Sequence, residues 1–154
     1  MPKRSAGLVV WRGSADGLEV LLVHPGGPFW ARKDDGAWSI PKGEIDADEE
    51  PLAVAAREFA EELGTPPPAL EAAIELGELR QPGGKIVMAW AVEGDLDVAD
   101  VRSNTFDMEW PRGSGRVRTF PEVDRADWFG PERARVKLLA GQVPFLDRLA
   151  ERVA

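Results

Sequence analysis

The sequence has no cysteine among its 154 residues. A disulfide framework, a zinc site built on thiolates and a thiol nucleophile are therefore excluded. Histidine is almost as scarce, because His24 is the only one. It falls at the end of a predicted strand, and we expect it to be structural.

A long apolar segment is also missing. The longest apolar run, residues 86–92, is far below the roughly 20 residues that a helix needs to span a bilayer. The first residues lead straight into a strand-like segment, without the apolar stretch and cleavage site of a secretory signal. We therefore expect no membrane contact and a cytoplasmic location.

Positive charge is scarce as well. The chain has 19 Lys and Arg against 27 Asp and Glu, a formal net charge of -8. This balance opposes the phosphate attraction on which proteins that bind duplex DNA or long RNA rely. A small anionic partner remains possible if local basic groups or a metal hold it. The length predicts a single domain over residues 1–154, as a monomer or a homodimer.

The order of the predicted elements indicates an α+β fold. Apolar patterns and turn residues predict strands at 5–12, 18–24, 38–40, 73–80, 85–93 and 126–129, and helices at 51–63, 131–140 and 143–153. The first two strands flank a glycine-containing loop at 13–17. Strands, one helix, more strands and then helices are typical of a mixed layered domain and not of a doubly wound sheet.

The helix at 51–63 has the clearest limits. Pro51 suits the first turn, and Gly64 before three prolines marks the end. An apolar stripe, which should face the sheet, runs along the helix: Leu52, Ala55, Ala56, Phe59 and Leu63.

Three carboxylates share another face of this helix. Glu58, Glu61 and Glu62 fall within an arc of about 100°, and no lysine or arginine within the next turn compensates their repulsion. A hard dication such as Mg²⁺ would turn that repulsion into attraction. Taken alone, the cluster is more typical of a solvated helix face on an acidic protein.

The glutamates belong to a longer pattern, Gly-x5-Glu-x7-Arg-Glu-Phe-x-Glu-Glu-x-Gly. It covers 22 positions and resembles the signature of the Nudix hydrolases. Two positions that are usually aliphatic depart from it: Phe59 is aromatic, and Thr65 is polar. The matching residues are Gly43, Glu49, Arg57, Glu58, Glu61, Glu62 and Gly64.

This resemblance implies an α/β/α sandwich with a mixed sheet and hydrolysis of a nucleoside diphosphate linked to another moiety. It implies Mg²⁺ or Mn²⁺ held mainly by Glu58 and Glu62, with Glu61 close by. Arg57 would orient the carboxylates. Gly43 would belong to the metal site by permitting a bend where a side chain would obstruct it.

Many Nudix relatives have a further glutamate, in a loop before a tryptophan near the C-terminus, that completes the metal site or acts as base. Glu122, six residues before Trp128, resembles it. Glu109 is the rival, because residues 107–111 also resemble a loop that could reach the site and its substrate.

Basic and aromatic residues are candidates for binding the substrate. Lys42 directly precedes Gly43, and Arg32 and Lys33 lie in the loop before it. We expect Trp38 and Trp110 in loops, where they can stack on a base, with Trp30 as a further candidate. Three more tryptophans are expected in the core: Trp11, Trp90 and Trp128. Two interpretations remain for Arg112, Arg116 and Arg118: they form either a basic flap over the phosphates or a solvated loop.

The triplet at 41–43, Pro-Lys-Gly, resembles the form found in Nudix enzymes that act on dinucleoside and diphosphoinositol polyphosphates. Our leading hypothesis is therefore a hydrolase of diadenosine-type nucleoside polyphosphates. Damaged nucleoside triphosphates or nucleotide sugars are alternative substrates. A catalytically silent nucleotide-binding sensor is an alternative of another class.

Overall fold

The computed structural model describes residues 2–14 and 17–153, so residues 15 and 16 of the first predicted loop lie outside the described part. Its strands are β1 (Arg4–Ser14), β2 (Gly17–Pro25), β3 (Lys42–Glu44), β4 (Ile74–Arg80), β5 (Ile86–Glu93), β6 (Thr105–Glu109), β7 (Val117–Pro121) and β8 (Val123–Phe129). Its helices are α1 (Pro51–Leu63), α2 (Pro131–Lys137) and α3 (Pro144–Val153), with 3₁₀ turns η1 (Val98–Asp100) and η2 (Ala140–Gln142). None of these helices is long and apolar enough to cross a membrane.

Strand β1 holds the main sheet together. It pairs antiparallel with β2 and β3 and parallel with β5. Strand β4 then pairs with β5 at one edge and β8 with β2 at the other, which gives the order β4-β5-β1-β2-β8. The sheet is therefore mixed, as predicted.

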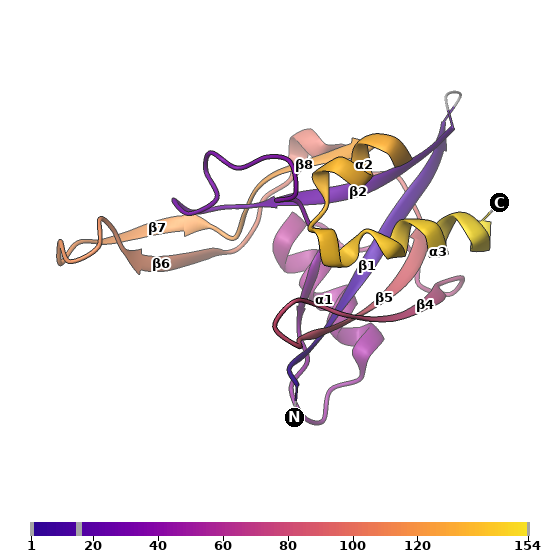
Figure 1. Ribbon diagram of the computed structural model, residues 1–154, viewed down its shortest axis with the longest axis horizontal. Coiled ribbons are helices and arrows are strands. Elements are labelled where there is room, and N and C mark those ends of the chain that lie inside the picture. Colours follow the sequence, from indigo (N-terminus) through magenta and orange to yellow (C-terminus); the bar gives the residue numbers. More distant parts are fainter. Residues whose placement is uncertain (1, 15–16, 154) are drawn as a thin grey trace.

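Alternating side chains of β1 separate two cores. Leu8 and Val10 point to the face that α1 covers, and Val9 points to the face that α2 and α3 cover. Figure 1 shows α1 behind the sheet and the two C-terminal helices in front of it. This α/β/α arrangement confirms the expected α+β fold.

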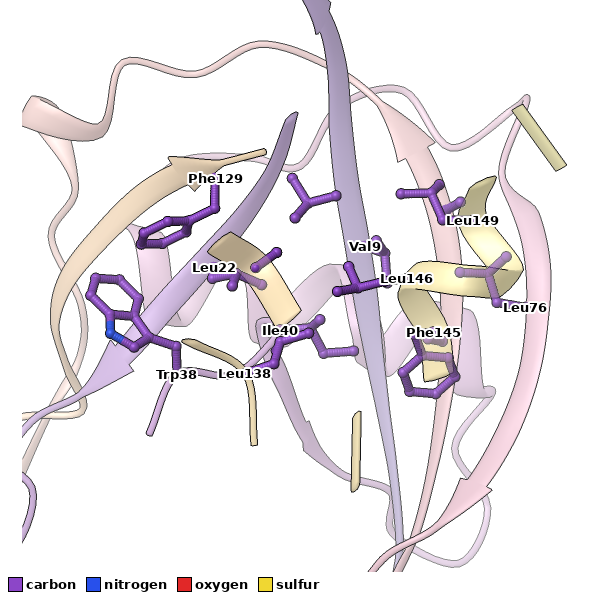
Figure 2. Close-up of a cluster of buried hydrophobic side chains, with 14 of the residues drawn as sticks. Val9, Leu22, Trp38, Ile40, Leu76, Phe129, Leu138, Phe145, Leu146 and Leu149 are labelled. Atoms are coloured by element: carbon purple, nitrogen blue, oxygen red, sulfur yellow. The ribbon is translucent and has the colours of Figure 1, made fainter. Parts of the chain in front are cut away.

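The core under α2 and α3 includes a tryptophan that was expected in a loop. Trp38 is 3% exposed and packs edge-on against Phe129, with ring centroids 5.0 Å apart (Figure 2). Its indole N–H donates to Asp34. The expectation of a loop tryptophan free to stack on a base was wrong, because the segment that carries it passes under α2.

Helix α1 has the predicted bounds. The Glu50 carboxylate accepts hydrogen bonds from the N–H groups of Leu52 and Ala53 at the start of the helix. At the end, Gly64 has φ 72° and its N–H donates to the Ala60 carbonyl. Glycine takes this left-handed conformation without a Cβ penalty.

Three boundary predictions need correction. The strand predicted at 38–40 consists only of isolated bridges, from Trp38 to Leu138 and from Ser39 to Val23. It forms no ladder because its neighbours lie on different elements, and the pairing with β1 comes later, at β3. The helix predicted to run to residue 140 ends at Lys137, and the strand predicted from 126 begins at Val123.

The region around 107–118, expected as loop, is a β-hairpin. Strands β6 and β7 pair antiparallel, with Phe106 opposite Phe120. Figure 1 shows this hairpin, called the arm below (residues 105–121), projecting away from the layered body. Strand β6 alternates polar and apolar residues and β7 mixes them without a clear period, over only five positions each. Such short patterns do not stand out from loop composition.

We predict that Phe59→Ala lowers the free energy of unfolding by about 3–5 kcal/mol, because Phe59 is 1% exposed in the core beneath α1. Urea denaturation measures the loss. Leu52→Ala, at a partly buried position of the same helix, is the control and should cost clearly less. Equal losses would contradict the packing described here.

Candidate functional site

Two glutamates of α1 lie directly against β3. A Cβ at Gly43 would lie 1.9 Å from the Glu58 side-chain carbon Cδ, so the carboxylate occupies the space that a side chain would fill. The Lys42 backbone N–H donates to Glu62 Oε1 at 3.1 Å. This close approach of helix and strand accounts for glycine at position 43.

Arg57 lies among the acidic groups of this helix face. It forms a charged hydrogen bond with Glu49, and its guanidinium nitrogens lie 3.6 Å from Glu58 and 3.8 Å from Glu61. The expectation that no basic residue compensates the glutamates was wrong, because the arginine next to Glu58 bends back over them. Since Arg57 is half-exposed, these contacts orient the carboxylates more than they stabilise the fold.

The carboxyl group of Glu62 is the most perturbed acid of the site. Its pKa is raised from 4.5 to about 8, mainly by burial; Glu58 and Glu122 also raise the pKa, while the Lys42 N–H and ammonium lower it. Burial and then Glu61 also raise the pKa of Glu58. The helix face therefore holds partly desolvated acids that repel one another.

Glu122 lies beside these helix carboxylates. It occupies the bend between β7 and β8, where its N–H donates to the Asn104 carbonyl and the Asn104 N–H donates to the Glu61 carbonyl, both at 2.8 Å. Burial and then Glu61 raise the pKa of Glu122. Backbone hydrogen bonds thus place this carboxyl group next to the end of α1.

Glu109, the rival candidate, lies elsewhere. It ends β6, and its carboxylate accepts a hydrogen bond of 2.7 Å from the Gly113 N–H in the turn of the arm. It is not among the residues that line the cavity beside Glu62. The structure therefore brings Glu122, and not Glu109, to the helix glutamates.

A cavity of about 190 Å³ opens beside these acids. Burial, and then Lys85, lower the pKa of the Lys42 ammonium in its lining. Of the two basic loop residues proposed to bind substrate, neither Arg32 nor Lys33 lines the cavity. The lining residues are Val23, Pro25, Trp30, Ala37, Ser39, Lys42, Glu62, Glu122, Val123 and Leu139.

A larger hollow, of about 370 Å³, follows β8 near α2 and η1. Acids such as Asp34 and Asp127 and bases such as Arg133 and Lys137 line it. None of the helix glutamates is among its lining residues, and its charges include both signs. The smaller cavity is therefore the better candidate for chemistry.

The donor set fits a hard divalent cation. No group of three or more His, Asp or Glu side chains is already arranged to hold a metal ion within residues 2–14 and 17–153. However, Glu58, Glu61, Glu62 and Glu122 supply the carboxylate oxygens that Mg²⁺ prefers. A dication would replace the mutual repulsion of these carboxylates with attraction.

His24 was expected to be structural, and its contacts agree with that role. It is 1% exposed, with Nδ1 2.7 Å from Asp124 Oδ1 and Nε2 2.6 Å from the Lys33 carbonyl oxygen. It therefore connects the loop at 26–36 to β8 at Asp124, which comes two residues after Glu122 in the sequence. Cavity residues such as Val23 and Leu139 were missed because they come from segments far apart in the sequence.

The comparisons with known proteins identify the family. A profile of the NUDIX domain matches residues 1–150. The chain belongs to the NUDIX domain family. The resemblance read from the glutamate pattern is confirmed.

Individual relatives are more distant. An RNA pyrophosphohydrolase of Hahella chejuensis (strain KCTC 2396) is 39% identical over 61 residues, which are 38% of each chain. The structure of an Ap4A hydrolase of C. elegans has a TM-score of 0.62 and 22% identity over the full length of both chains. The NUDIX domain of Shewanella oneidensis NrtR, solved with ADP ribose, has a TM-score of 0.66 and 17% identity over 100% of this chain and 90% of that one. At these identities the structures show a shared fold.

We predict that the metal-free protein loses stability as the pH rises. The folded chain keeps Glu62 protonated up to a pKa of about 8, against an ordinary value of 4.5. This contribution to stability is complete below the ordinary value and is lost as the pH rises through about 8. Denaturation in the presence of a chelator, across that pH window, measures the decline.

Glu62→Gln should flatten this pH dependence, because the amide stays neutral, and should leave the chain more stable than the unchanged protein above pH 8. The matched control is Glu75→Gln, at an exposed position of β4, which should keep the original slope. A Glu62→Gln profile that follows the unchanged protein would show that Glu62 is ionised in the folded state.

Proposed function

We propose that this chain is a Mg²⁺- or Mn²⁺-dependent pyrophosphohydrolase that cleaves a phosphoanhydride bond in a nucleoside polyphosphate, with diadenosine polyphosphates as the leading substrates. The observation that carries the proposal is the group of mutually repelling carboxylates beside a cavity that also contains Lys42. Such a group is costly to the fold unless cations bind to it.

Glu58 and Glu62 would hold the metal, with Glu61 and Glu122 next to them. When bound, the metal supplies positive charge beside the phosphate oxygens and lowers the pKa of water. Arg57 limits how far Glu58 and Glu61 can rotate through its contacts with both. The Lys42 N–H fixes one oxygen of Glu62 and leaves the other free for a cation.

A carboxylate must also accept the proton of the attacking water. We assign this role to Glu122, because no hydrogen bond among the described residues uses its side chain and because burial raises its pKa toward neutrality. Its place on a separate segment from α1 allows it to approach the reacting phosphorus from another side.

Lys42 lines the cavity together with Glu62 and Glu122. Burial lowers its pKa, which makes the charged form costly in the free protein. A phosphate group in the cavity would favour the charged form and gain a charge-assisted hydrogen bond. We therefore assign Lys42 to the phosphates beyond the metal and Trp30, across the cavity, to the nucleoside.

The relatives support the bond type more than the substrate. One is named as an RNA pyrophosphohydrolase and another as an Ap4A hydrolase, and both names refer to phosphoanhydride cleavage. Damaged nucleoside triphosphates and nucleotide sugars would need the same chemistry. A silent sensor would use the fold without turnover.

A substrate panel tests the proposal. The purified chain is incubated in Mg²⁺ or Mn²⁺ with diadenosine tetraphosphate, ATP, 8-oxo-dGTP and ADP-ribose, and the products are separated by chromatography. We expect turnover, fastest with diadenosine tetraphosphate, that a chelator abolishes. Tight binding without turnover of any compound would contradict hydrolysis and support the sensor.

Two glutamine variants complete this experiment. Glu122→Gln should lower kcat about a hundredfold or more, because it removes the proton acceptor. Glu109→Gln is the matched control in the arm and should keep kcat within about twofold. The reverse result would transfer the role of base to Glu109.

A further inference from the structure

The loop at 26–36 and the arm form one surface that begins at the cavity. Trp30 lines the cavity together with Glu62 and Glu122. The neighbouring Phe29, 45% exposed, meets Trp110 of the arm edge-on with ring centroids 5.5 Å apart. Two consecutive aromatic residues, Trp30 at the cavity and Phe29 against the arm, therefore lie between the candidate active site and the arm.

Cations lie over these rings. The Lys33 ammonium nitrogen is 5.0 Å from the centre of the Trp30 ring, and the Arg112 guanidinium carbon is 5.1 Å from that of Phe29. Arg116 follows in the turn, and its backbone carbonyl accepts a hydrogen bond from the backbone N–H of Trp110. We call these residues the platform: Phe29, Trp30, Lys33, Trp110, Arg112 and Arg116.

The loop is fixed in place beside the arm. The Gly26 N–H donates to the Glu122 carbonyl at 3.0 Å, and His24 holds the Lys33 carbonyl. The Phe106 ring of the arm packs against the backbone of Gly27. Figure 1 shows the loop that follows β2 running beside the arm. A surface ordered in advance loses little entropy when a ligand binds.

The platform is positively charged in an acidic protein. The chain carries a net charge of -8, yet the ion pairs within residues 2–14 and 17–153 include none with Lys33, Arg112 or Arg116. Unpaired cations over aromatic rings complement a ligand that offers both phosphate and a base. A nucleotide has this chemistry.

The cavity is too small for a whole substrate of the proposed kind. Its volume of about 190 Å³ is below the range of about 300–1,000 Å³ of pockets that enclose drug-sized ligands. Much of a nucleoside polyphosphate must then lie outside it, and the platform is the basic, aromatic surface that adjoins it.

We infer that the platform binds a second nucleotide unit beyond the nucleoside at the cavity, so that the enzyme selects substrates with two nucleosides over those with one. This inference rests on the proposed function. The distal nucleotide could be the second nucleoside of a dinucleoside polyphosphate or the next nucleotide of a 5′-triphosphorylated oligonucleotide, since the platform would contact the same chemical groups in both.

Equilibrium binding tests the inference. In a Glu122→Gln background with Mg²⁺, which slows turnover, calorimetry gives Kd for diadenosine tetraphosphate, ATP and a 5′-triphosphorylated dinucleotide. The test variant is Lys33→Ser with Arg112→Ser. The control is Lys3→Ser with Arg80→Ser, which removes the same two charges from exposed positions outside the platform.

We expect the test variant to raise Kd for diadenosine tetraphosphate or for the dinucleotide about tenfold or more, with a smaller rise for ATP, while the control shifts Kd less than about twofold. Of these two ligands, the one with the larger loss of affinity identifies the source of the distal nucleotide. An equal rise for all three ligands, or equal effects of test and control, would overturn the inference.

Failure of the proposed function has a different signature. If the intact chain hydrolyses nothing in the substrate panel, the enzymatic proposal fails. The affinities are measured without turnover, so they still decide whether the platform discriminates between ligands with one nucleoside and ligands with two.

Discussion

The contact between α1 and β3 determines where the acids of this protein lie. Because Gly43 has no side chain, the helix can approach until Glu58 fills that space and the Lys42 N–H reaches Glu62. The approach removes the carboxyl groups from water, and burial raises their pKa values. The cost of desolvation is the physical reason to expect a cation there, and the backbone hydrogen bonds around Asn104 add Glu122 to the same group.

Much of this arrangement could be predicted from local sequence. The limits of α1 follow from Pro51 and Gly64, and the spacing of its three glutamates follows from helical geometry alone. The strands on either side of the predicted loop at 13–17 pair antiparallel, and so do β4 and β5, which also follow one another closely in the chain. These features depend on residues close together in the chain, where propensity and periodicity carry the information.

The remainder depends on contacts between distant segments. Trp38 lies in a segment whose composition is typical of a loop, but its ring packs against Phe129, which is far from it in the sequence. The arm was missed because five-residue strands with charged residues resemble a loop, and pairing across its turn defines it. The cavity combines β2, the 26–36 loop, β3, α1 and the segment after α2, so no local pattern could predict its lining.

The most direct test is a calorimetric titration of Mn²⁺ into the protein near neutral pH, in two buffers with different ionisation enthalpies. A carboxyl group with a pKa of about 8 must lose its proton to bind the metal, so we predict that binding releases about one proton per ion. In Glu62→Gln this release should disappear. Absence of Mn²⁺ binding, or binding without proton release in the unchanged protein, would contradict a buried Glu62 that ionises only with a metal.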